Sequence, residues 1–147
     1  MMDHPTAPSD GGRRALQMVL AALAAIPFAT AALDIVAGSD YLPGGPNQTT
    51  PSMDSEFRFA STFWCAVGPV IWWQVPHVAR DSPLLPLTLS TVFAGGIARL
   101  QSWRQRGRPH PVFVAATALE LIGMPIVIIW RRKVVAKAKA ARLGARS

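Results

Sequence analysis

The sequence lacks most of the residue patterns on which enzymes and metal centres depend. It has one cysteine, Cys65, and a single thiol can form neither a disulfide within the chain nor a multi-cysteine metal site. Its three histidines, His4, His77 and His110, fall in separate segments and predict no histidine cluster. It contains no nucleotide-binding glycine loop, no haem-like pair of histidines and no Ser-His-Asp spacing. We therefore predict no metal site, no cofactor and no catalytic residue of a recognisable type.

Charged residues are also scarce. Of the 147 residues, 16% are charged and 50% are hydrophobic, which is a high apolar share for a soluble domain of this length. The net charge of +7 could indicate a nucleic-acid partner, but the basic residues gather at the ends of apolar runs instead of along one amphipathic surface. The composition therefore favours a membrane protein in contact with the lipid bilayer, and no nucleic acid is expected.

Apolar runs long enough to cross a bilayer recur along the chain. The first has 19 residues and would be about 28 Å long as a helix, close to the hydrocarbon thickness of a membrane. A secretory signal peptide is the alternative for this run, because Arg13 and Arg14 precede it. We predict an all-α, membrane-embedded bundle of four transmembrane helices over residues 15–130. The predicted spans are residues 15–33, 57–75, 83–100 and 112–130.

The remaining segments are polar. Residues 1–14 contain prolines and glycines and predict a short disordered cytoplasmic lead-in. Residues 35–56 form a connection whose prolines and glycines disfavour a long regular element, and it is long enough to fold over the mouth of the bundle. Residues 131–147 are a basic cytoplasmic tail, either a helix lying along anionic headgroups or a plain stop signal.

The basic residues also predict the orientation in the membrane. Lysine and arginine are enriched on the cytoplasmic side of membrane proteins. With both termini cytoplasmic, ten of the 15 basic residues lie inside, and this bias favours that topology. The ten are Arg13, Arg14, Arg80, Arg131, Arg132, Lys133, Lys137, Lys139, Arg142 and Arg146, and the five outside are Arg58, Arg99, Arg104, Arg106 and Arg108.

Two ionisable residues fall within or at the edge of the predicted spans. Such residues are costly in hydrocarbon and mark candidate functional sites by default. Side chains lean towards the N-terminus of their helix, so Arg99 leans inward and Glu120 leans outward, each towards the other. Glu120 lies about 12 Å below the start of its helix, within combined reach of Arg99. We predict an ion pair between them, either a structural clasp or a group for ligand or proton chemistry.

The predicted topology brings further polar residues to the same outer end. Arg58 begins the second span and is matched there with Asp34, Asp54 or Glu56. Small residues recur at helical spacing beside the ionisable ones, which favours close helix packing in lipid. These stripes are Thr88, Val92, Gly95, Arg99 and Ser102 on the third span and Ala116, Glu120 and Gly123 on the fourth. The candidate ligand or partner residues are Asp34, Asp54, Glu56, Arg58, Arg99, Ser102, Arg108, His110 and Glu120.

Several short motifs together resemble one protein family. They are DSEFRF at 54–59, Gly68, GGIARLQS at 95–102, GRPHP at 107–111 and LEL at 119–121. The chain from the first to the fourth span is similar in these motifs to the bacterial membrane family called domain of unknown function 4345. The resemblance implies a small four-helix integral protein of the bacterial plasma membrane, and it implies no established activity.

Two classes of function fit these observations. The first is a non-enzymatic accessory or assembly subunit of a larger membrane complex, or a homo-oligomer, which the lack of a catalytic constellation favours. The second is a membrane-embedded binding protein or enzyme for an apolar ligand, lipid, sterol-like or quinone-like, with Glu120 as acid or base. A transporter is less favoured, because the sequence shows no internal repeat or pair of broken helices.

Overall fold

The computed structural model describes residues 11–45 and 48–145, and within those residues every regular element is helical. The fourth helix is continuous from Pro111 to Gly144 but is divided by one π-helical turn, so the fold consists of four long helices. The elements are α1 (Gly11–Ala37), α2 (Pro51–Gln74), the 3-10 turn η1 (Val75–His77), α3 (Leu84–Arg106), α4 (Pro111–Ala118), the π turn η2 (Leu119–Gly123) and α5 (Met124–Gly144).

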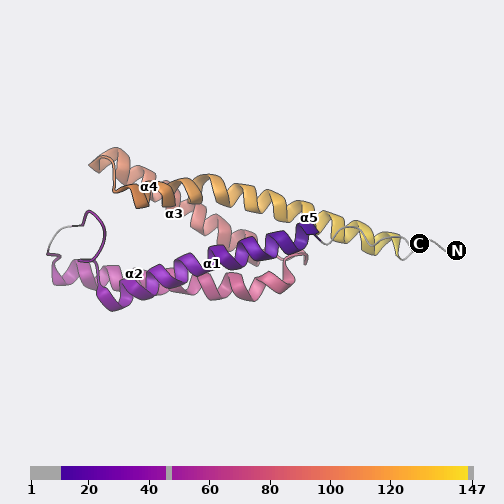
Figure 1. Ribbon diagram of the computed structural model, residues 1–147, viewed down its shortest axis with the longest axis horizontal. Coiled ribbons are helices and arrows are strands. Elements are labelled where there is room, and N and C mark those ends of the chain that lie inside the picture. The colour runs from indigo at the N-terminus through magenta and orange to yellow at the C-terminus, as the bar shows by residue number, and fades with distance from the viewer. Residues whose placement is uncertain (1–10, 46–47, 146–147) are drawn as a thin grey trace.

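The helices form two antiparallel pairs that meet at one end of the molecule and spread at the other (Figure 1). In one pair, α1 packs along α2. In the other, α3 packs along the continuous helix made of α4, η2 and α5. We call the end at which α1 begins and η1 lies the closed end. The end that holds the α1–α2 connection and the α3–α4 loop is the open end.

The core lies at the closed end. Its most buried side chains are aliphatic and come from α1, α3 and the segment after η1, and each is less than 2% exposed. Partly buried aromatic and aliphatic side chains surround them, so this end is filled by apolar packing. The largest fully buried side chains are Leu16, Leu20, Val78, Leu85 and Leu89.

Two polar contacts fasten the helices together at the closed end. Gln17 Nε2 donates to the Val75 carbonyl at 3.0 Å, which joins α1 to η1. Arg131 Nη2 donates to the carbonyls of Arg80 and Ser82, both at 2.8 Å, which joins α5 to the connection between α2 and α3. Arg131 is only 6% exposed, so the carbonyls compensate for the burial of its charge.

The helices extend beyond the predicted spans. Residues 11–14, predicted as lead-in, belong to α1, and the rest of the lead-in lies outside the described residues. The connection predicted over 35–56 is shorter, because α1 runs to Ala37 and α2 begins at Pro51. Thr50 caps α2 by accepting a hydrogen bond from the Met53 amide at 3.3 Å, and a proline is favourable in the first turn of a helix.

The basic tail is part of the last helix. Residues 131–144 continue α5 without a break, and the helix projects past the rest of the bundle (Figure 1). The tail continues α5 because it is rich in alanine, lysine and arginine, which are strong helix formers.

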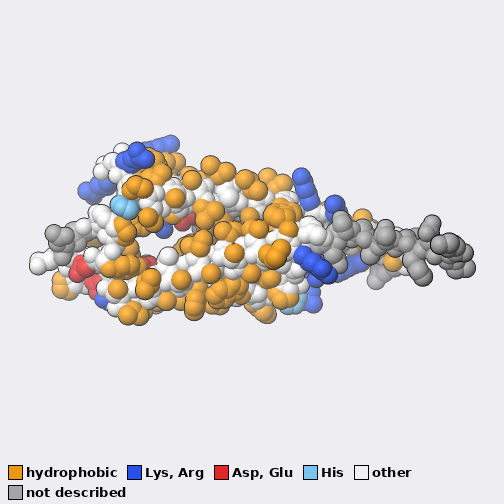
Figure 2. All heavy atoms as spheres, viewed as in Figure 1, with side chains coloured by type: hydrophobic (Ala, Val, Ile, Leu, Met, Phe, Trp, Pro, Cys, Tyr) orange, Lys and Arg blue, Asp and Glu red, His pale blue; other side chains and the backbone are white. Residues whose placement is uncertain are grey.

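The surface between the two ends is largely apolar. Figure 2 shows hydrophobic side chains over most of the visible face, with lysine and arginine gathered towards its ends. Two helices, α1 and the continuous helix from Pro111 to Gly144, are long and apolar enough to span a membrane, and only 22% of each apolar window is buried within the structure. Polar residues such as Arg58 in α2 and Arg99 in α3 lower the apolar character of the other two helices.

Candidate functional site

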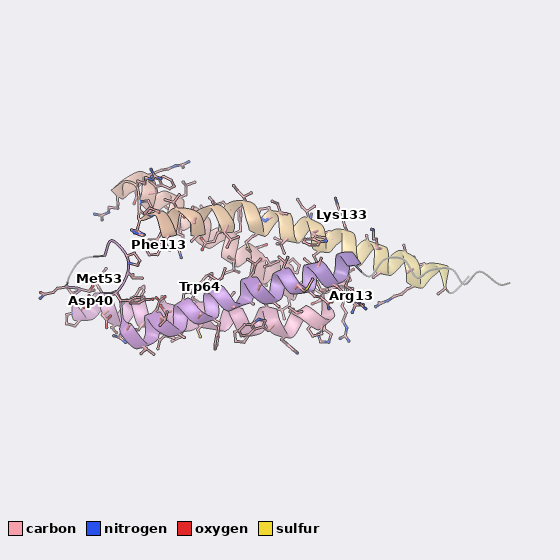
Figure 3. The ribbon with its side chains drawn as sticks, viewed as in Figure 1. Arg13, Asp40, Met53, Trp64, Phe113 and Lys133 are labelled. Atoms are coloured by element: carbon pink, nitrogen blue, oxygen red, sulfur yellow. The ribbon has the colours of Figure 1, made fainter. Side chains whose placement is uncertain are left out.

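A cavity of about 780 Å³ lies between the two helix pairs at the open end. Its hollow is visible between the pairs in Figure 2. Trp64 of α2 and Phe113 of α4 line it from opposite sides (Figure 3). Most of the other lining side chains are aliphatic, and the exceptions are concentrated in two polar groups, one on α3 and η2 and one on α1.

The first polar group is Arg99 with Glu120. Arg99 Nε lies 3.2 Å from Glu120 Oε1, to which it donates a hydrogen bond, and 3.1 Å from Oε2. The side chain of Glu120 is 8% exposed, whereas that of Arg99 is 39% exposed and faces the cavity. The two residues that helix direction predicted to meet therefore lie together, with the carboxylate buried and the guanidinium open to the cavity.

Local backbone structure places Glu120 in this position. It lies in η2, and π-helical turns are rare insertions that often occur at functional sites. The facing residue on α3 is Gly96, where an added Cβ would be only 2.9 Å from the Cβ of Glu120. The absence of a side chain at Gly96 therefore allows η2 to approach α3 closely enough for the carboxylate to reach Arg99.

The guanidinium of Arg99 is only partly used by the protein. Its Nε contacts Glu120, and its carbon lies 5.8 Å from the centre of the Phe113 ring, within the range of a cation–π interaction. Among the described residues, its two terminal nitrogens, Nη1 and Nη2, have no hydrogen-bond partner. A guanidinium has five N–H donors, so four of them remain for another molecule.

The second polar group lies on the α1 wall. The Tyr41 hydroxyl donates to Asp34 Oδ1, and Ser61 Oγ donates to Asp34 Oδ2 at 3.3 Å. Asp34 and Tyr41 both line the cavity. Partial burial and the hydrogen bond to the Asp34 carboxylate raise the pKa of Tyr41 to about 12. Nearby, Trp64 Nε1 donates to Thr30 Oγ1 at 3.2 Å, which joins α2 to α1 beside the cavity.

Arg58 and Asp54 form a separate structural contact at the end of α1. Arg58 Nε lies 2.7 Å from Asp54 Oδ2, and Arg58 Nη1 donates to the carbonyls of Ile35 and Val36. This arrangement satisfies carbonyls that the last turn of α1 leaves without partners. The hydrogen bond from Arg58 lowers the pKa of Asp54. Arg58 thus pairs with Asp54 and not with Asp34. Glu56 is exposed and forms no hydrogen bond or ion pair with a described residue.

The remaining predicted residues lie at the rim. Ser102 is exposed and lines the cavity. His110 has a structural role, because its Nδ1 accepts a hydrogen bond from the Val112 amide at 3.4 Å and caps α4. Arg108 is exposed and has no partner within the described parts of the chain. The structure therefore brings Asp34, Arg99, Ser102 and Glu120 to the cavity and places the other five candidates outside it.

Two residues that shape the site, Gly96 and Tyr41, were not predicted from the sequence. The small-residue stripe on α3 named Gly95, but an added Cβ at Gly95 would meet nothing within 4 Å, and the close contact is at Gly96. The two glycines are adjacent, so a period of three to four residues could not choose between them. Tyr41 was missed because it lies in the connection, where no helical periodicity relates it to Asp34. No group of three or more His, Cys, Asp or Glu residues suited to a metal occurs in the described residues.

Comparison with known proteins gives a family and no function. No curated protein and no solved structure matches the chain. A family model described as domain of unknown function (DUF4345) matches residues 15–131, which include α2 and α3, most of the first and last helices, the residues that line the cavity and the Arg99–Glu120 pair. Because this match covers most of the sequence, the chain belongs to the DUF4345 family.

Proposed function

We propose that this protein is a membrane-embedded binding protein for a small, largely apolar molecule. The cavity supports the proposal, because its volume of about 780 Å³ is within the range of small-molecule sites and its wall combines apolar side chains with a few polar groups. The accessory-subunit role that the sequence favoured rests on the lack of catalytic residues. Binding without catalysis accounts equally well for that lack and also accounts for the cavity.

The proposal includes four membrane spans with both termini cytoplasmic, in the plasma membrane of a bacterium. Large apolar side chains are exposed on every long helix, including Met18 on α1, Phe63 on α2, Leu87 on α3 and Ile126 on α5. In water such an exposed apolar surface would favour aggregation, whereas in a bilayer it can contact the lipid chains directly. The open end then lies in the outer half of the membrane.

Cysteine labelling tests this topology. The variants Ser52→Cys, at the open end, and Lys137→Cys, on α5 beyond the closed end, are made separately in a Cys65→Ser background. On intact cells, an impermeant thiol reagent should label position 52 and leave position 137 unlabelled until the cells are opened. Labelling of position 137 alone on intact cells would reverse the orientation, and labelling of both would contradict an even number of spans.

The helix arrangement also suggests how a ligand reaches the cavity. Within the described residues, no Cα atom of α1 lies within 8 Å of one in α4, although both helices line the cavity. We propose that the space between these two helices, on the side that would face lipid, is the entrance to the cavity. An apolar molecule dissolved in the bilayer could enter by this path without crossing water.

Recovery of the native ligand tests the proposed function. The protein is extracted with its surrounding lipid into polymer-bounded discs, and the small molecules that accompany it are identified by mass spectrometry. Ala116→Phe would fill part of the cavity, while Ala118→Phe is a matched control on the same helix at a position that does not line it. An enriched molecule should accompany the wild type and the control but not Ala116→Phe. Identical extracts from all three proteins would contradict ligand binding in the cavity.

An accessory or assembly subunit is the second candidate. The observation that favours it is a group of three exposed arginines at the rim of the open end, Arg104, Arg106 and Arg108, none of which has a partner among the described residues. Such a group could contact an acidic partner protein or a second copy of the chain. Purification in mild detergent should then recover a stoichiometric partner, and substitution of all three arginines by serine should release it. Recovery of the chain alone as a monomer would contradict this role.

A further inference from the structure

The unused donors of Arg99 indicate the chemistry of the molecule that fills the cavity. We propose, on the basis of the binding function above, that the ligand is an uncharged lipid-soluble molecule with a carbonyl oxygen that accepts hydrogen bonds from the terminal nitrogens of Arg99. Its apolar part lies deeper, against Trp64, Leu89 and Met124.

The position of the guanidinium provides the first step. Arg99 is fixed through Nε by Glu120 and on one face by Phe113, so its terminal nitrogens have a defined direction before any ligand binds. Neither nitrogen has a partner among the described residues, and the side chain lines the cavity. A polar group that faces an apolar space without a partner is unfavourable, and an acceptor oxygen would remove this cost.

The charges around the cavity provide the second step. The positive charge of Arg99 is already balanced by Glu120 at 3.1 Å. The opposite wall carries the carboxylate of Asp34. A carboxylate or phosphate ligand would therefore add a negative charge that no lining residue balances, and such a charge is costly in a low-dielectric space. A carbonyl oxygen uses the same donors without adding a charge.

The Asp34 group differs from Arg99 because it is already engaged within the protein. Each of its carboxylate oxygens accepts one hydrogen bond, Oδ1 from Tyr41 and Oδ2 from Ser61. Asp34 also lies near the mouth, at the end of α1, whereas Glu120 lies in η2 against α3. Arg99 is thus the positively charged lining residue whose terminal donors have no partner among the described residues.

Four probes of equal chain length separate the possible headgroups. They are a long-chain methyl ketone, the n-alkane, the fatty acid and the primary amine, each added at the same mole fraction to the full-length protein in phosphatidylcholine nanodiscs. Affinity is obtained from the increase in unfolding temperature as a function of probe content, since a ligand that binds the folded state stabilises it. We expect the ketone to bind about 10-fold to 100-fold more tightly than the alkane, as for a hydrogen bond to a charged group.

Two variants test whether Arg99 causes this preference. The double variant Arg99→Met with Glu120→Gln removes the donors without leaving an unpaired charge, and it should reduce the ketone-to-alkane ratio to about one while alkane affinity is unchanged. Gln101→Met removes an exposed polar side chain from the same helix outside the cavity, and it should keep the wild-type ratio. A readout that needs no variant is the carbonyl stretching frequency of the ketone, which should fall on binding to the wild type.

The outcomes distinguish this inference from the function on which it rests. Equal binding of ketone and alkane, or an unchanged ratio in the double variant, would overturn the role of Arg99 but leave an apolar binding site. Tighter binding of the fatty acid or the amine would also overturn it, by showing that the site selects a charge. Failure of all four probes to bind would overturn the binding function itself.

Discussion

The two ends of the bundle use arginine in opposite ways. At the closed end, Arg131 is buried and donates to two backbone carbonyls, so it fastens α5 to the connection between α2 and α3. At the open end, Arg99 is held by one carboxylate and leaves its terminal nitrogens facing a cavity. Both residues follow long apolar stretches, and the sequence indicated a partner for Arg99 but none for Arg131. Their surroundings decide that one is structural and the other is available to a ligand.

This comparison divides the molecule into a region that stabilises the fold and a region that is free to bind. The aliphatic core gathers at the closed end, and at the open end the two helix pairs are separated by the cavity. A site formed where packing is incomplete can accept a ligand without displacing core side chains. Substitutions at the closed end should therefore affect stability most, and those at the open end should affect stability less.

The largest expected effect is at Arg131. Replacement by methionine removes two hydrogen bonds from a charged donor and leaves two carbonyls to find other partners, so we expect Arg131→Met to lower the free energy of unfolding by about 3 kcal/mol. The adjacent Arg132 is exposed, and Arg132→Met is the matched control, with a change of less than about 0.5 kcal/mol. Denaturant unfolding in detergent micelles measures both. Equal losses would show that Arg131 is not the fastening residue.

A pair of leucine truncations on α1 compares the two ends directly. Leu20 is fully buried at the closed end, whereas Leu33 is 56% exposed and lines the cavity. We expect Leu20→Ala to cost about 2 to 3 kcal/mol, in the lower part of the range for buried leucines, because lipid removes much of the hydrophobic contribution. Leu33→Ala should cost less than about 1 kcal/mol. Similar shifts in unfolding temperature would contradict the division into two regions.

The fold could be predicted from the sequence more fully than the site. Four apolar runs of suitable length predict four long helices because each helix satisfies its own backbone hydrogen bonds. Helix ends were less predictable: the cap at Thr50 and the continuation of α5 through its alanine-rich tail depend on local contacts that hydropathy does not measure. Arg99 and Glu120 could be paired because helix direction and rise alone bring them to one depth.

The cavity itself could not be predicted. It results from the angle between two helix pairs, and that angle depends on packing among residues distant in sequence, such as Leu20 and Leu85, which belong to the same buried cluster. The π turn at Glu120 and the choice of Gly96 over Gly95 are likewise set by tertiary contact. Arg58 shows the same limit. Asp54, one helical turn away on the same helix, was among its predicted partners, but its contacts with the end of α1 became evident only in the structure.

The Arg99–Glu120 pair should have an intermediate effect on stability. Arg99→Met and Glu120→Gln should each cost about 2 kcal/mol, less than the 3 to 5 kcal/mol typical of a fully buried pair, because Arg99 is 39% exposed. The double variant should recover about 1 to 2 kcal/mol of the summed loss, since no unpaired charge remains. Thermal unfolding of the four proteins gives this coupling energy, and additive losses would show that the two side chains do not interact.

The smallest expected effect on stability is at Tyr41. The titration of its hydroxyl can nevertheless be followed without a signal from any other tyrosine. Tyr41 is the single tyrosine of the chain, so phenolate absorbance reports on it alone. Its pKa is raised from 10.0 to about 12, and a group whose pKa is higher in the folded state stabilises the fold below its unfolded pKa. That contribution should be complete below about pH 10 and be lost between about pH 10 and 12 as the hydroxyl deprotonates. The loss should be small because Tyr41 is 42% exposed.

Substitution of Asp34 tests whether its contact with Tyr41 contributes to the raised pKa of the Tyr41 hydroxyl. Asp34→Asn removes the charge that opposes the phenolate, so the pKa of Tyr41 should fall towards 10, while Asp40→Asn, in the same connection, should leave it near 12. Neither variant should change the unfolding temperature at neutral pH as much as Leu20→Ala, because neither touches the closed end. If Asp34→Asn left the titration unchanged, the hydroxyl and carboxylate would not be in contact. The α1 wall of the cavity would then need a different arrangement from the one in which Tyr41 and Ser61 donate to Asp34 while the terminal nitrogens of Arg99 face the cavity.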